Sequence, residues 1–164
     1  MRGKIFIFMV LTLFLLVSVS FAGEYGVYVK VIERAKGSFD EVSSKVETVL
    51  KNAGWEVLAA YNTGVPEGCK FRSKVIVFSS PAYAKAIMST GVKAAFSLPL
   101  RAGIYEDESG INVAVVNPAS LNRTIIHETK LNDLSLSSIN YIVDAIAKAV
   151  HGSVVKKQIG EVRS

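Results

Sequence analysis

Apolar residues recur at helical spacing in four segments of the chain, and each segment carries end signals of its own. The clearest begins at Ser38, whose hydroxyl can accept a hydrogen bond from the Glu41 amide while the Glu41 carboxylate reaches back. Gly54 follows it, and a glycine in the left-handed backbone conformation is a common C-terminal end of an α-helix. Ser80 and Asn117 each precede a proline, a pattern that favours a helix start. The predicted helices cover residues 39–53, 81–90, 118–123 and 133–151, the last with Asp133 as its expected N-cap.

Runs rich in β-branched and aromatic residues lie between these helices and predict strands. Some strands are apolar on both alternating faces: Val75 and Val77 point one way, whereas Ile76 and Phe78 point the other. Strands joined by short connections pair antiparallel, so the pattern predicts a two-layer α+β fold with a largely antiparallel sheet and helices packed on one face. The predicted strands cover residues 25–33, 55–61, 74–79, 94–98, 100–106 and 111–116, with a hairpin turn at 107–110.

The first residues carry the signature of export. Arg2 and Lys4 precede a long apolar run, and the small residues Ser20 and Ala22 fit a signal-peptidase site, which makes residues 1–22 a predicted signal peptide. The alternative is an uncleaved membrane anchor, because residues 5–22 number 18 and a span needs about 20. In either case we expect the domain outside the cytoplasmic membrane, in the periplasm or beyond the cell, and in contact with a membrane only if the segment is uncleaved.

The rest of the chain is short enough for one domain. The full chain has 164 residues, and after the signal segment we expect a single α+β domain over residues 23–152. Residues 153–164 show no hydrophobic period, so they are predicted to form a loose C-terminal tail.

Composition removes several classes of function. One cysteine and two histidines exclude a disulfide scaffold and the usual cysteine- or histidine-rich metal sites, so we expect no metal and no cofactor. The net charge of +5 is spread along the chain, which argues against a nucleic-acid partner. The sequence holds no recognisable catalytic motif, and its one adjacent imidazole and carboxylate, His127 and Glu128, would face opposite ways on a strand. The expectation therefore leans away from an enzyme.

Two residues remain as candidates for ligand binding. Cys69 lies in a loop beside Lys70 and can form an intermolecular bridge or be a reactive, redox-active or metal-handling thiol. The alternative is a buried thiol that acts as a small hydrophobe. Arg101 lies within an apolar run, where it can hold a small anion together with the helix starts near Pro81 and Pro118. The alternative for Arg101 is a solvent-facing position that pairs with Glu106 or a cross-strand acid.

Four separated strings of the chain resemble the domain-of-unknown-function family 302 and occur in the family's order over residues 28–126. They are SFDEVSSKVETVLKNAGWEVL, SSPAYAKAIM, AAFSLPLRAGIYEDESG and VAVVNPASLNR. The resemblance implies a compact α+β domain, often dimeric, with no established activity. Common members carry Cys-Asn-Pro before the second helix, where this chain has Ser79, Ser80 and Pro81. A role of that cysteine therefore does not carry over.

These observations favour an exported, non-enzymatic binding or assembly domain, with thiol chemistry at Cys69 or anion binding at Arg101 as alternatives. A small anionic or apolar molecule is the expected ligand. A homodimer is also expected, because the predicted helices can cover one face of the sheet but hardly both. The alternative to a dimer is that the last helix folds over the second face and seals a monomer.

Overall fold

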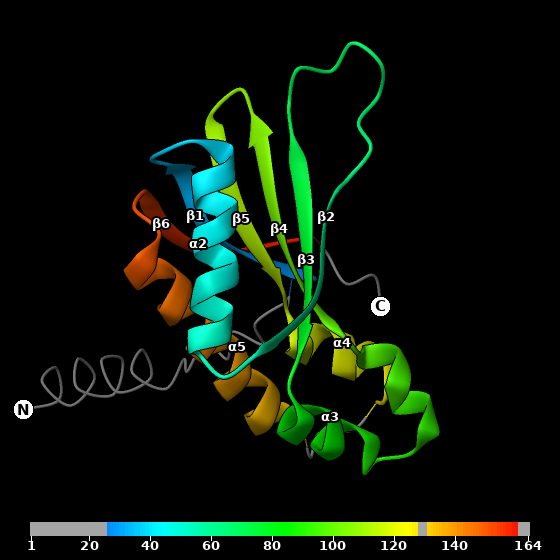
Figure 1. Ribbon diagram of the computed structural model, residues 1–164. Coiled ribbons are helices and arrows are strands. Elements are labelled where there is room, and N and C mark those ends of the chain that lie inside the picture. Colours follow the sequence, from blue (N-terminus) through cyan, green and yellow to red (C-terminus); the bar gives the residue numbers. More distant parts are fainter. Residues whose placement is uncertain (1–25, 128–130, 161–164) are drawn as a thin grey trace, which may run out of the picture.

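Residues 26–127 and 131–160 are the part of the chain that the computed structural model describes (Figure 1). The signal segment predicted over residues 1–22 lies outside it. The strands are β1 (Tyr28–Ala35), β2 (Glu56–Asn62), β3 (Ser73–Ser79), β4 (Leu100–Asp107), β5 (Gly110–Val116) and β6 (Ser153–Ile159). The helices are α2 (Phe39–Asn52), α3 (Pro81–Met88), α4 (Pro118–Ile125) and α5 (Asn132–Ala149), with a 3₁₀ helix η1 (Val92–Ser97).

The strands form one six-stranded sheet in the order β2-β3-β4-β5-β1-β6. Every pairing between described strands is antiparallel. The predicted α+β fold with a largely antiparallel sheet is confirmed, and the hairpin predicted at residues 107–110 joins β4 to β5. The edges of the sheet are β2 and β6.

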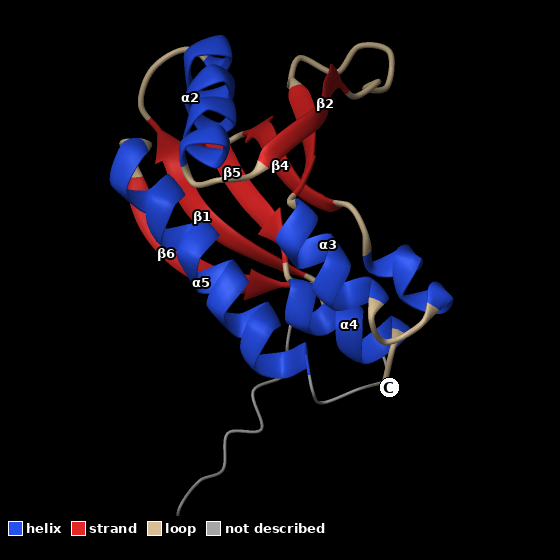
Figure 2. Cartoon of the chain, turned by 60° about the horizontal axis from the view of Figure 1, so that its bottom comes forward, coloured by secondary structure: helices blue, strands red, loops and turns tan. Residues whose placement is uncertain are grey.

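Helices α2 and α5 lie on the same face of the sheet, and α3, η1 and α4 gather at one end of it (Figure 2). The two faces of β3 differ as predicted, since Ile76 and Phe78 are fully buried under the helices and Val75 and Val77 are half-buried on the other face. Because α5 packs beside α2, the alternative in which the last helix covers the second face is wrong. That second face, called here the open face, carries Tyr28, Val75, Val77, Arg101, Gly103, Tyr105 and Ala114.

Local end signals place α2 as the sequence predicts. The Ser38 hydroxyl accepts from the Glu41 amide at 3.2 Å, and the Glu41 carboxylate accepts from the Ser38 amide at 2.7 Å. Gly54 follows the helix with φ of +83°, where a glycine avoids the strain of a side chain. The cap predicted for α5 is wrong: the helix begins after Leu131, and Asp133 lies inside its first turn.

Two predicted segments take a different form. Residues 94–98 are not a strand, because residues 92–97 form η1, in which Ala94 and Ser97 are buried three residues apart, the period of a 3₁₀ helix. The tail predicted to be loose from residue 153 is wrong over residues 153–159, which form β6 beside β1. Strand β6 is exposed on both alternating faces, so backbone pairing rather than an apolar pattern holds it in place.

Candidate functional site

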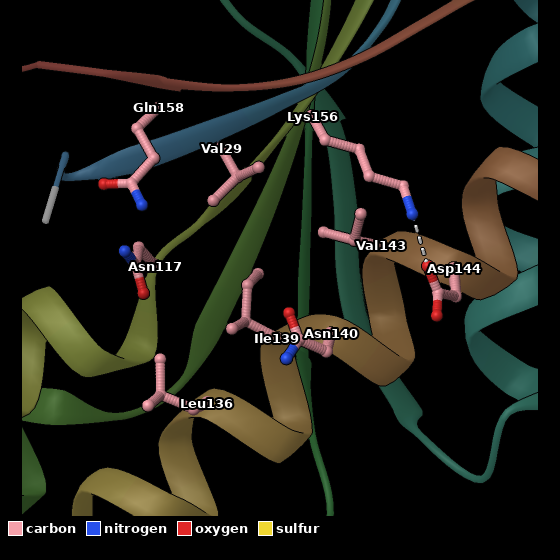
Figure 3. A pocket seen from close by; sticks show the side chains of 9 residues that line it. All are labelled: Val29, Asn117, Leu136, Ile139, Asn140, Val143, Asp144, Lys156 and Gln158. Atoms are coloured by element: carbon pink, nitrogen blue, oxygen red, sulfur yellow. Dashed lines mark hydrogen bonds and ion pairs between the residues drawn. The ribbon is translucent and has the colours of Figure 1, made fainter. Parts of the chain in front are cut away.

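A groove runs between α5 and the strands β1 and β6, on the face of the sheet that the helices cover (Figure 3). Its volume is about 400 Å³, within the range of about 300–1,000 Å³ found for small-molecule sites. Apolar side chains of α5 and β1 form its floor, and polar side chains surround them. The lining residues are Val29, Asn117, Leu136, Ile139, Asn140, Val143, Asp144, Lys156 and Gln158.

Asn117 closes one end of the groove and is held by two hydrogen bonds. Its Oδ1 accepts from the Ala119 amide at 3.1 Å, which caps α4, and its Nδ2 donates to the Gly26 carbonyl at 3.0 Å. The role of Asn117 as a helix cap is therefore confirmed. Since both ends of this buried carboxamide are occupied, Asn117 is a fixed wall of the groove rather than a free binding group.

Two other carboxamides have groups available for a ligand. The Oε1 of Gln158 accepts from the Gly26 amide at 2.7 Å, which sets the orientation of its amide and leaves Nε2 directed at the groove (Figure 3). Within the described residues that Nε2 makes no hydrogen bond, and neither does the exposed carboxamide of Asn140 on α5. The groove therefore presents a fixed donor on β6 and an adaptable amide on α5.

Lys156 covers the other end of the groove. The register between β1 and β6 shifts between Lys30 and Ile32, because β6 has one residue more than β1 over this stretch, which is a β-bulge. Lys156 lies at this bulge with φ of +45°, and its ammonium donates to the Asp144 carboxylate at 2.7 Å (Figure 3). That hydrogen bond lowers the pKa of Asp144 below its ordinary value. A bulge redirects side chains, and a lysine held at positive φ is a strained feature of the kind found at functional sites.

The polar side chains of the groove are one ion pair and several carboxamides. Its acidic group, Asp144, is already paired with Lys156, and its other polar groups are carboxamides, which neither attack nor transfer protons at neutral pH. Across the described residues no cluster of three potential metal ligands of the His, Cys, Asp or Glu type occurs. His127 follows α4, and its neighbour in sequence, Glu128, lies outside the described residues.

Cys69 lies in the loop between β2 and β3, far from the groove along the chain. Its side chain is exposed, so the alternative of a buried thiol is wrong. Its Sγ makes a weak hydrogen bond, 4.0 Å long, to the carbonyl oxygen of Phe71. Among the described residues, Cys69 belongs to no group of three potential metal ligands, and thiol chemistry at Cys69 stays a prediction.

Arg101 lies on the open face of β4, opposite Val77 of β3. It does not pair with Glu106, because residues five apart on a strand face opposite ways, and Glu106 binds Arg72 instead, with 3.0 Å between Nη2 and Oε1. The amides at the nearby helix starts are partly occupied by the caps Ser80 and Asn117. Anion binding at Arg101 stays a prediction. The fold does not bring Arg101 and Cys69 together, because Arg101 lies beside the end of β3 and Cys69 precedes its start.

A polar cluster beneath α3 is buried in the core. The Nδ2 of Asn122 donates to the Ser135 hydroxyl at 2.7 Å and approaches the Tyr83 hydroxyl at 3.5 Å. The Oδ1 of Asn122 is buried and has no hydrogen-bond partner among residues 26–127 and 131–160. Burial raises the pKa of Tyr83 above its usual range. Trp55 packs edge-on against this ring, so the cluster ties α3, α4 and α5 together from within.

Together, the fold and the groove define a small α+β domain with one sheet face that no described helix covers and a groove lined by apolar side chains, carboxamides and one ion pair. The family model described as "Domain of unknown function DUF302" matches residues 31–150, and the chain belongs to this family, as its motifs predict. It is similar to a solved structure described as "Crystal structure of uncharacterized conserved protein DUF302 from Bacillus stearothermophilus". The two share 14% identity and a TM-score of 0.63 over 76% of this chain and 98% of that chain, a likeness in fold. No protein of curated function matches the chain.

Most of the groove was missed by reasoning from the sequence. Lys156 and Gln158 lie in the segment whose lack of a hydrophobic period predicts a loose tail, and outside the residues that the family model matches. Their spacing of two residues is the one signal that places both on one side of a strand. That signal has meaning only once the segment is known to pair with β1.

Proposed function

We propose that this protein is an exported, non-enzymatic binding domain whose ligand site is the groove between α5 and β6. The observation that carries the proposal is the combination of an apolar floor with unengaged carboxamide groups on opposite walls, contributed by Gln158 and Asn140. A few placed polar groups over an apolar surface are the usual composition of small-molecule sites. Export is supported by the apolar segment that ends at Ala22.

The lining also restricts the chemistry of the ligand. Leu136, Ile139 and Val143 favour an apolar body, and the Nε2 of Gln158 favours a hydrogen-bond acceptor at its end. Lys156 and Asp144 neutralise each other, so the groove offers little attraction to a strongly charged molecule. The ligand class that fits is a small, mainly apolar molecule that ends in a carbonyl or carboxylic group.

Thermal unfolding in the presence of candidate ligands tests this proposal. The panel consists of medium-chain and aromatic carboxylic acids, amides and ketones, with hydrocarbons of the same size as comparators. A ligand at about ten times its Kd should add about 1.4 kcal/mol to the free energy of unfolding and raise Tm by about 5 °C. Hydrocarbons should give a smaller shift, because they leave the Gln158 amide unpaired.

A pair of variants locates the binding. Asn140→Trp places a large ring at the mouth of the groove and should abolish the shift, whereas Lys148→Trp, at an exposed position of the same helix that does not line the groove, should preserve it. Loss of the shift in both variants, or in neither, would contradict the assignment to this groove.

We also propose that two copies assemble through the open face. The observation behind this second role is that no described helix covers that face, although Val75 and Val77 on it are apolar and half-buried. At its centre, the space above Gly103 is open, since a Cβ there would meet no atom within 4 Å, and its neighbour Ala114 is small and buried, so a second copy can approach the face closely. The aromatic rings of Tyr28 and Tyr105, from β1 and β4, are of the kind enriched in interfaces.

Gly103 offers a clean test of assembly. A Cβ at Gly103 would meet no atom within 4 Å, so Gly103→Arg should fold normally while it places a charge at the centre of the open face. Sedimentation should show a dimer for the wild type and a monomer for Gly103→Arg. Gly64→Arg, at another unhindered glycine in the β2–β3 loop, serves as the control and should stay dimeric. A monomeric wild type would refute the assembly role.

A further inference from the structure

The segment from α3 to η1 exposes large apolar side chains that the fold does not use. Val92 is 82% exposed and Phe96 is 78% exposed, and both values exceed those of every other large hydrophobic residue in the described ranges. Met88, at the end of α3, is 40% exposed. We call Met88, Val92 and Phe96 the apolar tip. Large apolar side chains this exposed, within nine residues of one another along the chain, mark a surface that contacts something apolar.

The fold explains why these three side chains point outward. Tyr83 and Ile87 anchor the inner side of α3, and Ala94 and Ser97 anchor the inner side of η1. Gly91 turns the chain between them at φ of +126°. The remaining positions therefore face solvent, where α3 and η1 project from one end of the sheet (Figure 1).

The charged residues of α3, η1 and α4 are all basic. No aspartate or glutamate occurs in residues 68–105, a stretch that includes all of α3 and η1. Lys85 precedes Met88 by three residues, and Lys93 lies within η1, both with exposed side chains. The neighbouring helix α4 adds Arg123 and has no acidic residue. Exposed apolar groups bordered by lysines are the composition of surfaces that enter the headgroup region of anionic membranes.

The start of the described chain lies at this same end. Gly26 is bound to Asn117 at the beginning of α4, with 3.0 Å between the Gly26 carbonyl and the Asn117 Nδ2, and α4 packs against η1. The apolar residues 5–22 precede Gly26 by only a few positions in the sequence. If that segment stays uncleaved as an anchor, the chain enters the domain at the end that bears the apolar tip.

We infer that the apolar tip is a membrane-contact surface, in which Met88, Val92 and Phe96 enter the interface of an anionic bilayer and Lys85 and Lys93 bind its phosphate groups. No described helix is long and apolar enough to cross a membrane, so this contact is interfacial. It is independent of the ligand groove, which lies between α5 and β6, and of the open face of the sheet.

Environment-sensitive fluorescent labels test the contact on the exported protein as it is purified, with or without residues 1–22. One form carries an NBD fluorophore on the native Cys69, in the β2–β3 loop at the far end of β3 from α3 (Figure 1). The other form, Cys69→Ser with Ala95→Cys, carries the label beside Phe96 at an exposed position of η1. Each form is mixed with vesicles of phosphatidylglycerol and phosphatidylcholine, or of phosphatidylcholine alone.

The label at position 95 should brighten several-fold and shift to shorter wavelength with the anionic vesicles, and the label at Cys69 should not change. Adding Val92→Ser and Phe96→Ser should remove the response, and unchanged emission from Trp55 would show that the fold persists. Lys85→Glu with Lys93→Glu should weaken the response, whereas the matched pair Lys36→Glu with Lys45→Glu should leave it intact.

Other results would overturn the inference. No response at position 95 with either vesicle excludes the membrane contact, and so does an equal response from the label at Cys69. An equal response to neutral and anionic vesicles refutes the role of the lysines. A response without vesicles that grows with protein concentration assigns the apolar tip to a second copy of the chain instead.

Discussion

Replacing Gly152 by alanine should destabilise the protein, because this residue joins α5 to β6 and its backbone lies against β1 with no room for a side chain. A Cβ at Gly152 would lie 2.6 Å from Cγ2 of Ile32, 3.0 Å from Cα of Ala35 and 3.1 Å from the carbonyl oxygen of Glu33. Two of these three atoms belong to the backbone and the third to a fully buried side chain, so a rotamer change cannot relieve the contact. The methyl group therefore has to push β6 away from β1.

The expected loss is about 2 kcal/mol in the free energy of unfolding, the middle of the range for overpacked sites, which lowers Tm by about 7 °C. Urea unfolding followed by the fluorescence of Trp55, the one tryptophan of the chain, measures this loss because its ring is buried against Phe78. Gly64→Ala is the control: its Cβ meets nothing within 4 Å, and the substitution should add about 0.4–1 kcal/mol. Equal stability of Gly152→Ala and wild type would refute the close packing of β6 on β1.

Two further predictions follow from surface groups. Hydrogen bonds from Arg72 lower the pKa of Glu106, so this pair stabilises the fold above the ordinary pKa of a glutamate and its contribution is lost as the pH falls through the lowered value. Glu106→Gln should therefore show a flatter decline of Tm in acid than wild type, with an effect of about 1 kcal/mol or less, and Glu108→Gln should match wild type. Cys69 should react with iodoacetamide in the native state at a rate close to that in urea, and a thiol that reacts only after unfolding would contradict its exposure.

Local signals made the helices predictable. Ser38 and Glu41 specify the start of α2 through two hydrogen bonds between residues three apart, so no distant part of the fold is needed to interpret them. The alternation of side chains along β3 correctly predicts its two faces, because one face packs on the helices and the other does not.

The errors share a physical cause, which is that the deciding contacts are distant in sequence or weakly encoded. In η1, a short run of small and apolar residues fits a strand and a 3₁₀ helix equally well, and packing against α3 and α4 decides between them. In β6, the side chains of Val154 and Val155 are exposed, and only pairing with β1, more than a hundred positions earlier, makes this segment a strand. The groove depends on that pairing, so the candidate site could not be inferred before the fold.

Native mass spectrometry of the protein purified from its own cells tests the central claim most directly. A binding domain with its site between α5 and β6 should carry a small non-covalent molecule, which is released on unfolding and is mainly apolar with a carbonyl or carboxylic group. The same preparation of Asn140→Trp should show the bare chain, and Lys148→Trp should retain the molecule. Wild type that is bare under gentle conditions, or a bound mass that survives in Asn140→Trp, would contradict the account.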